Sequence, residues 1–147
     1  QQQQPGGSSN NGLNAVESQE MLNRINAYRS QNGLPGLSVD QRLTNAATGH
    51  SQDQASHCTM THEGSSGVGL GDRVTRQGYV WSAVAENVAA GQQTVESVMT
   101  SWWNSAGHRA NILSRNAKNV GFAKAVNNGC GNYQIYWTQD FGKLMNE

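Results

Sequence analysis

The stretch VGFAKAVNNGCGNYQIYWTQDF, residues 120–141, decides the fold. Apolar and polar side chains alternate over residues 120–126 and again over residues 133–141, which is the period of half-buried β-strands. Between them, residues 127–131 read Asn-Asn-Gly-Cys-Gly, a composition typical of a turn. We therefore expect two antiparallel strands that form the centre of an antiparallel sheet.

Helical patterns precede this hairpin. A capping-box pair, Asn14 and Glu17, opens a first helix whose apolar residues recur at helical spacing until Asn32. A similar capping pattern at Ser38 predicts a second helix that runs to about Ser56.

A third helix is expected from Thr94 to Asn104, followed by a short helical segment over His108–Leu113. After the second helix, residues 57–78 are expected to form a long loop, interrupted only by a short turn of helix around residues 71–77. Because the helices come before the strands, we assign the chain to the α+β class, with helices packed on a sheet.

Length and charge limit the classes of function. The chain has 147 residues, enough for one domain, and 10 Lys+Arg balance 10 Asp+Glu. A neutral chain lacks the electrostatic footprint of a nucleic-acid binder, and no apolar run is long enough to span a bilayer. We expect residues 1–13 to be a disordered tail and residues 14–147 to be a single domain, acting as a monomer.

The ends and the cysteines indicate the compartment. The sequence begins at Gln1 without Met, as after removal of a secretion signal, although a shortened chain would look the same. Cys58 and Cys130 are too far apart for a local zinc or redox motif, which leaves one long-range disulfide or two buried free thiols. We expect the disulfide, and therefore a secreted, extracellular protein.

Three ionisable residues are candidates for a site: His62, Glu86 and His108. We place each in a loop or at the end of an element, where side chains commonly face a cleft. Two imidazoles and a carboxylate could hold Zn²⁺ with an open water position, or could act as an acid–base set without metal. Their sequence spacing alone does not show that they meet. His50, on the apolar side of the second helix, is better interpreted as a buried structural histidine.

Three stretches resemble signatures of the CAP superfamily, which groups cysteine-rich secretory, antigen 5 and pathogenesis-related 1 proteins. They are AENVAAG (85–91), SWWNSAGHRANIL (101–113) and YWTQDFG (136–142). The resemblance implies a secreted α-β-α sandwich, with helices on both faces of a central antiparallel sheet. It also implies a central cleft that gathers His62, Glu86 and His108.

The sequence departs from the fuller animal and plant pattern of that superfamily. There a second glutamate precedes the second histidine, whereas residues 101–107 contain no acidic residue and Ser105 stands about where the glutamate would be. The motif over residues 101–113 is more similar to that of the shorter bacterial and fungal branch of the superfamily. A single Cys58–Cys130 bridge also fits that branch. Any metal site is thereby reduced to His62, His108 and Glu86, and we expect zinc or another divalent ion to be weakly bound and not required.

Three functions follow from these observations. The resemblance implies a secreted protein that binds a lipid, a fatty acid or sterol, or another extracellular ligand, in defence, virulence or host interaction. The alternatives are a divalent-metal-dependent hydrolase that uses the His/Glu cleft and an extracellular scaffold that docks a protein partner. No activated Ser or Cys nucleophile is apparent, so we do not commit to a catalytic residue. In each case we expect the Glu86 carboxylate to pair with His62 or His108.

Overall fold

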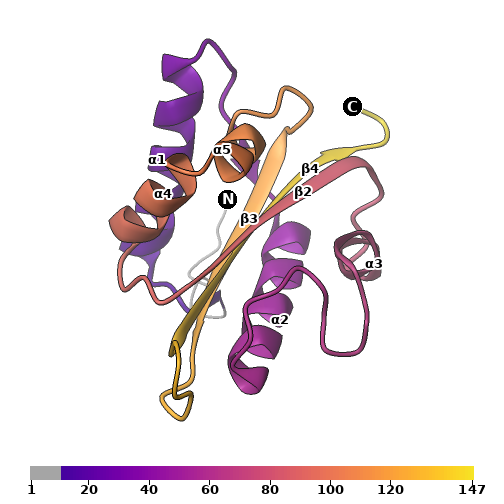
Figure 1. The fold of residues 1–147 in the computed structure, drawn as a ribbon. Helices are drawn as coiled ribbons and strands as arrows, with labels where there is room; N and C mark the ends of the chain where they lie inside the picture. Colours follow the sequence, from indigo (N-terminus) through magenta and orange to yellow (C-terminus); the bar gives the residue numbers. More distant parts are fainter. Residues whose placement is uncertain (1–10) are drawn as a thin grey trace.

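The computed structural model describes residues 11–147 as three layers (Figure 1). Helices α1 (Ala15–Gln31), α4 (Val95–Trp103) and α5 (Ala106–Ile112) lie on one side of the sheet, and α2 (Gln41–His57) and α3 (Leu70–Arg76) lie on the other. This arrangement confirms the expected α-β-α sandwich.

The sheet has four strands in the order β1-β3-β4-β2. The expected hairpin is present as β3 (Asn119–Val126) and β4 (Ile135–Leu144), which pair antiparallel at the centre of the sheet. The short strand β1 (Ser38–Val39) pairs parallel to β3, so the sheet is mixed. Helix α2 therefore begins after β1, at the N-cap Asp40, and not at Ser38 as expected.

Strand β2 (Trp81–Ala90) was not anticipated from the sequence. It pairs antiparallel with β4 along its whole length, at the edge of the sheet. Its sequence, WSAVAENVAA, is rich in alanine and carries Glu86 and Asn87 at buried positions, so it lacks the alternation that marks a half-buried strand. Glu86 therefore lies in the middle of a strand, and its assignment to a loop or an element end was wrong.

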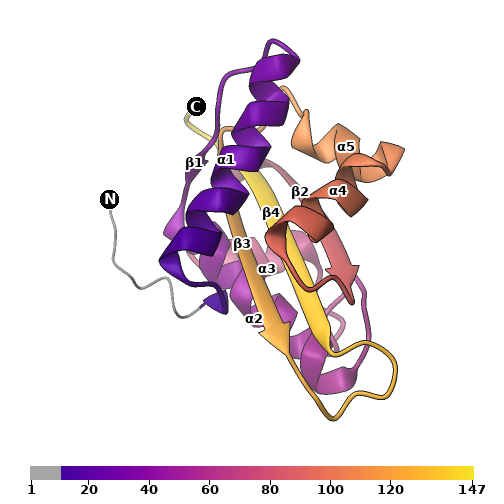
Figure 2. The same ribbon diagram turned by 90° about the vertical axis from the view of Figure 1, so that its left-hand side faces the viewer.

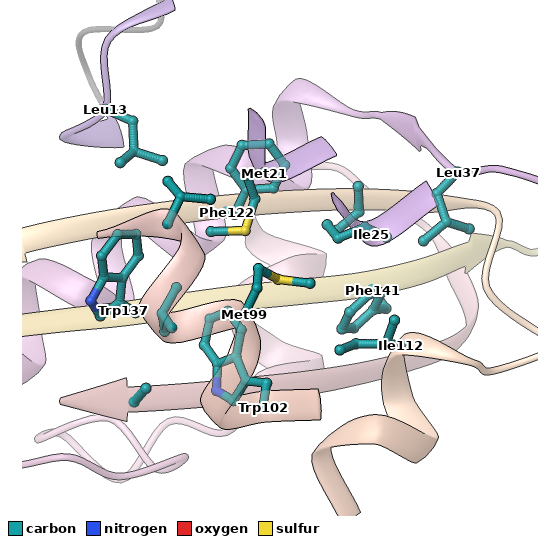
Figure 3. Packing of buried hydrophobic residues seen from close by; sticks show 14 of the residues in the cluster. Leu13, Met21, Ile25, Leu37, Met99, Trp102, Ile112, Phe122, Trp137 and Phe141 are labelled. Atoms are coloured by element: carbon teal, nitrogen blue, oxygen red, sulfur yellow. The ribbon is translucent and has the colours of Figure 1, made fainter. Parts of the chain in front are cut away.

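The main apolar core lies between the sheet and helices α1 and α4 (Figures 2 and 3). Met21 of α1 and Met99 and Trp102 of α4 pack against Trp137 and Phe141 of β4. Tyr28 and Trp103 stack at 3.9 Å between ring centroids and join the two helices at the border of this core. The apolar stripes of the two helices thus form the core that their spacing predicts.

Helix α2 packs closely on the opposite face of the sheet. A side chain at Gly121 of β3 would collide with the α2 backbone, because an added Cβ would lie 2.1 Å from the nitrogen of Thr44. This close approach brings the buried face of α2, including His50, over the polar side chains of β2 and β4. His50 is 1% exposed, and its Nε2 donates to the carbonyl of Thr61, which confirms the structural interpretation of this histidine.

The N-terminal boundary of the domain differs from the prediction. Residues 1–10 of the expected tail lie outside the described residues. The expectation is wrong for residues 11–13, because Leu13 is 1% exposed within the core and the Asn11 side chain donates to the Phe122 carbonyl. Leu13 and the hydrogen-bonded Asn11 thus attach residues 11–13 to the folded domain.

Cys58 and Cys130 form a disulfide bond, as expected. Cys58 is the C-cap of α2, with a left-handed backbone (φ 53°), and Cys130 follows the turn after β3. The bond thus ties the end of α2 to the β3–β4 turn. Of residues 11–147, no helix is both long and apolar enough to cross a membrane.

Candidate functional site

The Glu86 carboxylate is the centre of a buried polar cluster. Its side chain is 1% exposed and points from β2 toward the α2 side of the sheet, where Asp140 of β4 is its cross-strand partner. Burial alone would raise the pKa of Glu86, but its interactions with Asp140, His62 and Arg73 outweigh that effect and lower the pKa to about 2. Glu86 is therefore an anion throughout the physiological pH range.

Arg73 supplies the positive charge of the cluster. The side chain extends from α3 and is 11% exposed. It donates hydrogen bonds to both carboxylate oxygens of Glu86: Nη1 lies 2.7 Å from Oε2, and Nη2 lies 3.1 Å from Oε1. Nη2 also donates to the backbone carbonyl of His62, at 2.6 Å. One guanidinium thus neutralises the buried carboxylate and fixes the loop that carries His62.

His62 is the imidazole that pairs with Glu86. Its Nδ1 lies 3.1 Å from Glu86 Oε1, while the side chain as a whole is 60% exposed. The hydrogen bond to Glu86 raises the pKa of His62 above its usual value. The expected pairing of Glu86 with one of the two candidate imidazoles is confirmed.

Asp140 and His50 complete the cluster from the buried side. Asp140 is fully buried, and no other side chain among residues 11–147 donates to its carboxyl oxygens. Burial and the charge of Glu86 raise the pKa of Asp140 well above its usual value, so the carboxyl keeps its proton. His50 Nε2 lies 4.0 Å from Glu86 Oε1, and burial lowers the pKa of this imidazole.

His108 lies at the start of α5, apart from the carboxylate. Its Nδ1 contacts Ser105 Oγ at 2.8 Å, and its backbone carbonyl accepts from Asn87 of β2. Asn111, one turn further along α5, donates to the carbonyl of Glu86, so hydrogen bonds fix α5 to the edge of β2. Partial burial, and then the nearby His62, lower the pKa of His108. Of the three predicted residues, two are in contact, and the third is held separately.

The residues do not fit the expected metal ion. In the part of the chain that the structure describes, no three His, Cys, Asp or Glu side chains are grouped so that they could hold one. A carboxylate has about four lone-pair positions, and three of those of Glu86 are directed at two Arg73 nitrogens and at His62. A divalent ion would have to displace a bidentate guanidinium to reach Glu86.

Sequence reasoning missed three residues of this site: Arg73, Asp140 and Ser105 as the partner of His108. Asp140 left a signal, since an acidic residue within the predicted strand YWTQDF requires a buried partner. Arg73 left a weaker signal, a basic residue on the short helix within a long polar segment. Neither signal names the partner, because the contacts join separate elements.

Comparison with known proteins places these features in a family. Residues 22–141 match the family model of CAP, the cysteine-rich secretory protein family. YkwD of Bacillus subtilis is 31% identical over 122 residues, which cover 83% of this chain and 45% of YkwD. The chain spans less than half the length of the curated relatives it matches.

Solved structures agree with the family match. An extracellular protein of Bacillus anthracis that contains an SCP domain superposes with a TM-score of 0.75 at 30% identity, over 85% of this chain and 39% of that one. An outer surface protein of Borrelia burgdorferi has the same fold, with a TM-score of 0.79 at 18% identity, over 88% and 94% of the two chains. The matched family model, which spans both the Glu86 and His108 segments, shows that this chain belongs to the CAP family.

Proposed function

We propose that the chain acts outside the cell as a monomeric binding protein, and that it binds a lipid whose polar end contacts His62 and His108. The state of Glu86 is the observation that carries this proposal. Its carboxylate is enclosed by Arg73, His62 and Asp140, so it serves as a fixed anchor and is not free to act as a general base. What remains accessible is the largely exposed imidazole of His62 and, in part, that of His108, an arrangement that suits recognition better than hydrolysis.

Of the two lipid classes considered, a fatty acid fits the site at His62 better than a sterol does. The His62 imidazole has a raised pKa and a largely exposed ring, so it can carry a positive charge toward a carboxylate. Met60, two residues away, is 52% exposed and offers an apolar surface to an acyl chain. The loop over residues 57–69 contains no aromatic side chain to stack on a sterol. We place this binding in defence, virulence or host interaction, the roles that the family resemblance implies.

Lipid extraction and direct binding test this proposal. Mass spectrometry of lipids extracted from the purified protein, and titration with a long-chain fatty acid and with a sterol, should show saturable binding of the fatty acid alone. His62→Ala should weaken this binding at least about tenfold, whereas His57→Ala, another exposed histidine, should leave it unchanged. Equal binding by both variants, or no fatty-acid binding at all, would contradict the proposal and favour a scaffold that docks a protein partner.

A second candidate function, hydrolysis, has one observation in its favour. Ser105 is the N-cap of α5, yet its hydroxyl caps no backbone N–H and instead lies 2.8 Å from His108 Nδ1. This is the distance expected between a nucleophile and its base. Hydrolysis of activated esters that is lost in both Ser105→Ala and His108→Ala, with the fold intact, would establish this activity. Hydrolysis that survives Ser105→Ala would exclude Ser105 as its nucleophile.

A further inference from the structure

A pocket of about 240 Å³ lies between α2, α3 and the loop that joins these helices. Figure 1 shows the two helices on the same side of the sheet. The polar lining of this α2–α3 pocket includes Asn45 and Asp53 of α2, Ser66 of the loop, and Arg76 and Gln77 of α3. Neither His62 nor His108 lines it, so the pocket is separate from the surface proposed above for a lipid.

Gly49 lies in the middle of α2, at the wall of the α2–α3 pocket. Glycine inside a helix is destabilising relative to alanine, so its presence there needs a reason. Packing does not supply one, because an added Cβ at Gly49 would meet no atom within 4 Å. The backbone does not supply one either, since Gly49 is not among the residues with a positive φ. What the missing side chain provides is open space in the pocket, directly against the helix backbone.

The α2–α3 pocket carries charges of both signs. Hydrogen bonds from the Ser65 hydroxyl and backbone nitrogen, at 2.6 and 2.7 Å, lower the pKa of Asp53, which is therefore an anion at neutral pH. Arg76 is exposed and takes part in no ion pair among residues 11–147. An anionic ligand would be repelled by Asp53, and a cationic one by Arg76. A hydroxyl group suits both, because it donates a hydrogen bond to a carboxylate and accepts one from a guanidinium.

The size and the remaining polar groups narrow the class of ligand. Pockets for drug-sized ligands measure about 300–1,000 Å³, so this smaller pocket suits a single ring. The amides of Asn45 and Gln77 and the hydroxyl of Ser66 add further donors and acceptors to its lining. A small amino acid would match the two charges, but its aliphatic part would leave these polar groups without partners. A ring that carries several hydroxyl groups satisfies all of them.

We propose that the α2–α3 pocket binds one uncharged sugar ring, which lies over Gly49 and forms hydrogen bonds to Asp53 and Arg76. The inference is independent of the lipid proposed above, because the two sites share no residue. Failure of fatty-acid binding would therefore leave it standing, and its own failure would leave the lipid proposal standing.

Titration of the ¹⁵N-labelled chain, followed by nuclear magnetic resonance of its backbone amides, tests this inference. The probes are four neutral sugars (glucose, galactose, mannose and N-acetylglucosamine), the charged sugars glucuronate and glucosamine, and the amino acid alanine. At least one neutral sugar should give saturable shifts at the amides of Gly49, Ser66 and Gln77, with a Kd of about 10 mM or tighter. The charged sugars and alanine should bind at least about tenfold more weakly.

Two variants locate the binding. Gly49→Ala should raise the melting temperature, because alanine favours the helix, and should weaken sugar binding at least about tenfold, because its methyl group enters the pocket. Gly107→Ala is the matched control: Gly107 is also a helical glycine whose added Cβ would meet no atom within 4 Å, but it lies in α5, across the sheet. Its affinity should equal that of the wild type. Arg76→Gln, a change at an exposed side chain, should weaken binding and leave the fold intact.

Three results would overturn the inference. The first is the absence of saturable shifts at these amides with any of the four neutral sugars. The second is wild-type affinity in Gly49→Ala, which would place the ring elsewhere. The third is preferred binding of alanine or of a charged sugar, which would make the pocket a site for a charged ligand.

Discussion

The two faces of strands β2 and β4 differ in the side chains that dominate them. Toward α1 and α4, Trp137 and Phe141 join an apolar core, and toward α2, the Glu86 anion forms a buried polar cluster with Arg73 and the protonated Asp140. The apolar face depends on burial and packing, which are not directional, whereas the polar face depends on each partner being present. The difference implies that the two faces respond differently to substitution and to pH.

The largest expected effect is on the apolar face. Trp102 is 1% exposed and fills the core between α4 and the sheet, so Trp102→Ala should lower the free energy of unfolding by about 3–5 kcal/mol. The loss should be similar at acidic and neutral pH, since no titratable group is removed. Urea unfolding at several pH values measures it. A loss that changed strongly with pH would show that the two faces are coupled.

On the polar face, Arg73→Ala should lower the free energy of unfolding at neutral pH by a comparable amount, about 3–5 kcal/mol. The substitution leaves the buried charge of Glu86 without its partner. The pH dependence should differ. The pKa of Glu86 is lowered from 4.5 to about 2, so its interactions stabilise the fold fully above 4.5 and less as pH falls toward 2. The cost of Arg73→Ala should therefore shrink over that window. Urea unfolding of both chains at matched pH values checks this, and a cost independent of pH would argue against the ion pair.

The contrast between the faces also explains what the sequence could predict. The hairpin was predictable because apolar burial leaves a periodic pattern along β3 and β4. Strand β2 was not, because Glu86 and Asn87 occupy buried positions and interrupt that pattern. The pairing of Glu86 with an imidazole was foreseen on the ground that a carboxylate needs a donor. That the main donor is Arg73 depends on how α3 packs, which no local pattern encodes.

The disulfide lies beyond both faces, at the end of α2. Replacing Cys58 and Cys130 by Ala should lower the free energy of unfolding by about 2–4 kcal/mol, because the bond closes a long loop and restricts the unfolded chain. The polar cluster should stay intact, since neither cysteine contacts it. Denaturant unfolding of the oxidised wild type and the double variant gives the difference. Loss of the Glu86–His62 contact in the variant would show that the bond also positions the site.

A smaller effect of opposite sign is expected at Asp140. Because burial raises the pKa of this carboxyl, its proton favours the folded state fully below 3.8, and that stabilisation is lost as pH rises toward the folded pKa. Asp140→Asn replaces the buried carboxyl with an amide that stays uncharged at every pH. It should therefore stabilise the chain at about pH 8, on the order of 1 kcal/mol, and less at about pH 4. Melting temperatures at both pH values decide this, and destabilisation at both would be inconsistent with a protonated Asp140.

The most direct test of the central claim, that Glu86 is a permanently charged anchor for His62, is a nuclear magnetic resonance titration of the histidine rings. The pKa of His62 should lie above 6.5 and that of His108 below it, and Glu86→Gln should lower the pKa of His62 and leave His108 little changed. The stability carried by His62 is then present below 6.5 and is lost as pH rises through its folded pKa. A His62 pKa at or below 6.5 in the wild type, or one that Glu86→Gln does not change, would contradict the account.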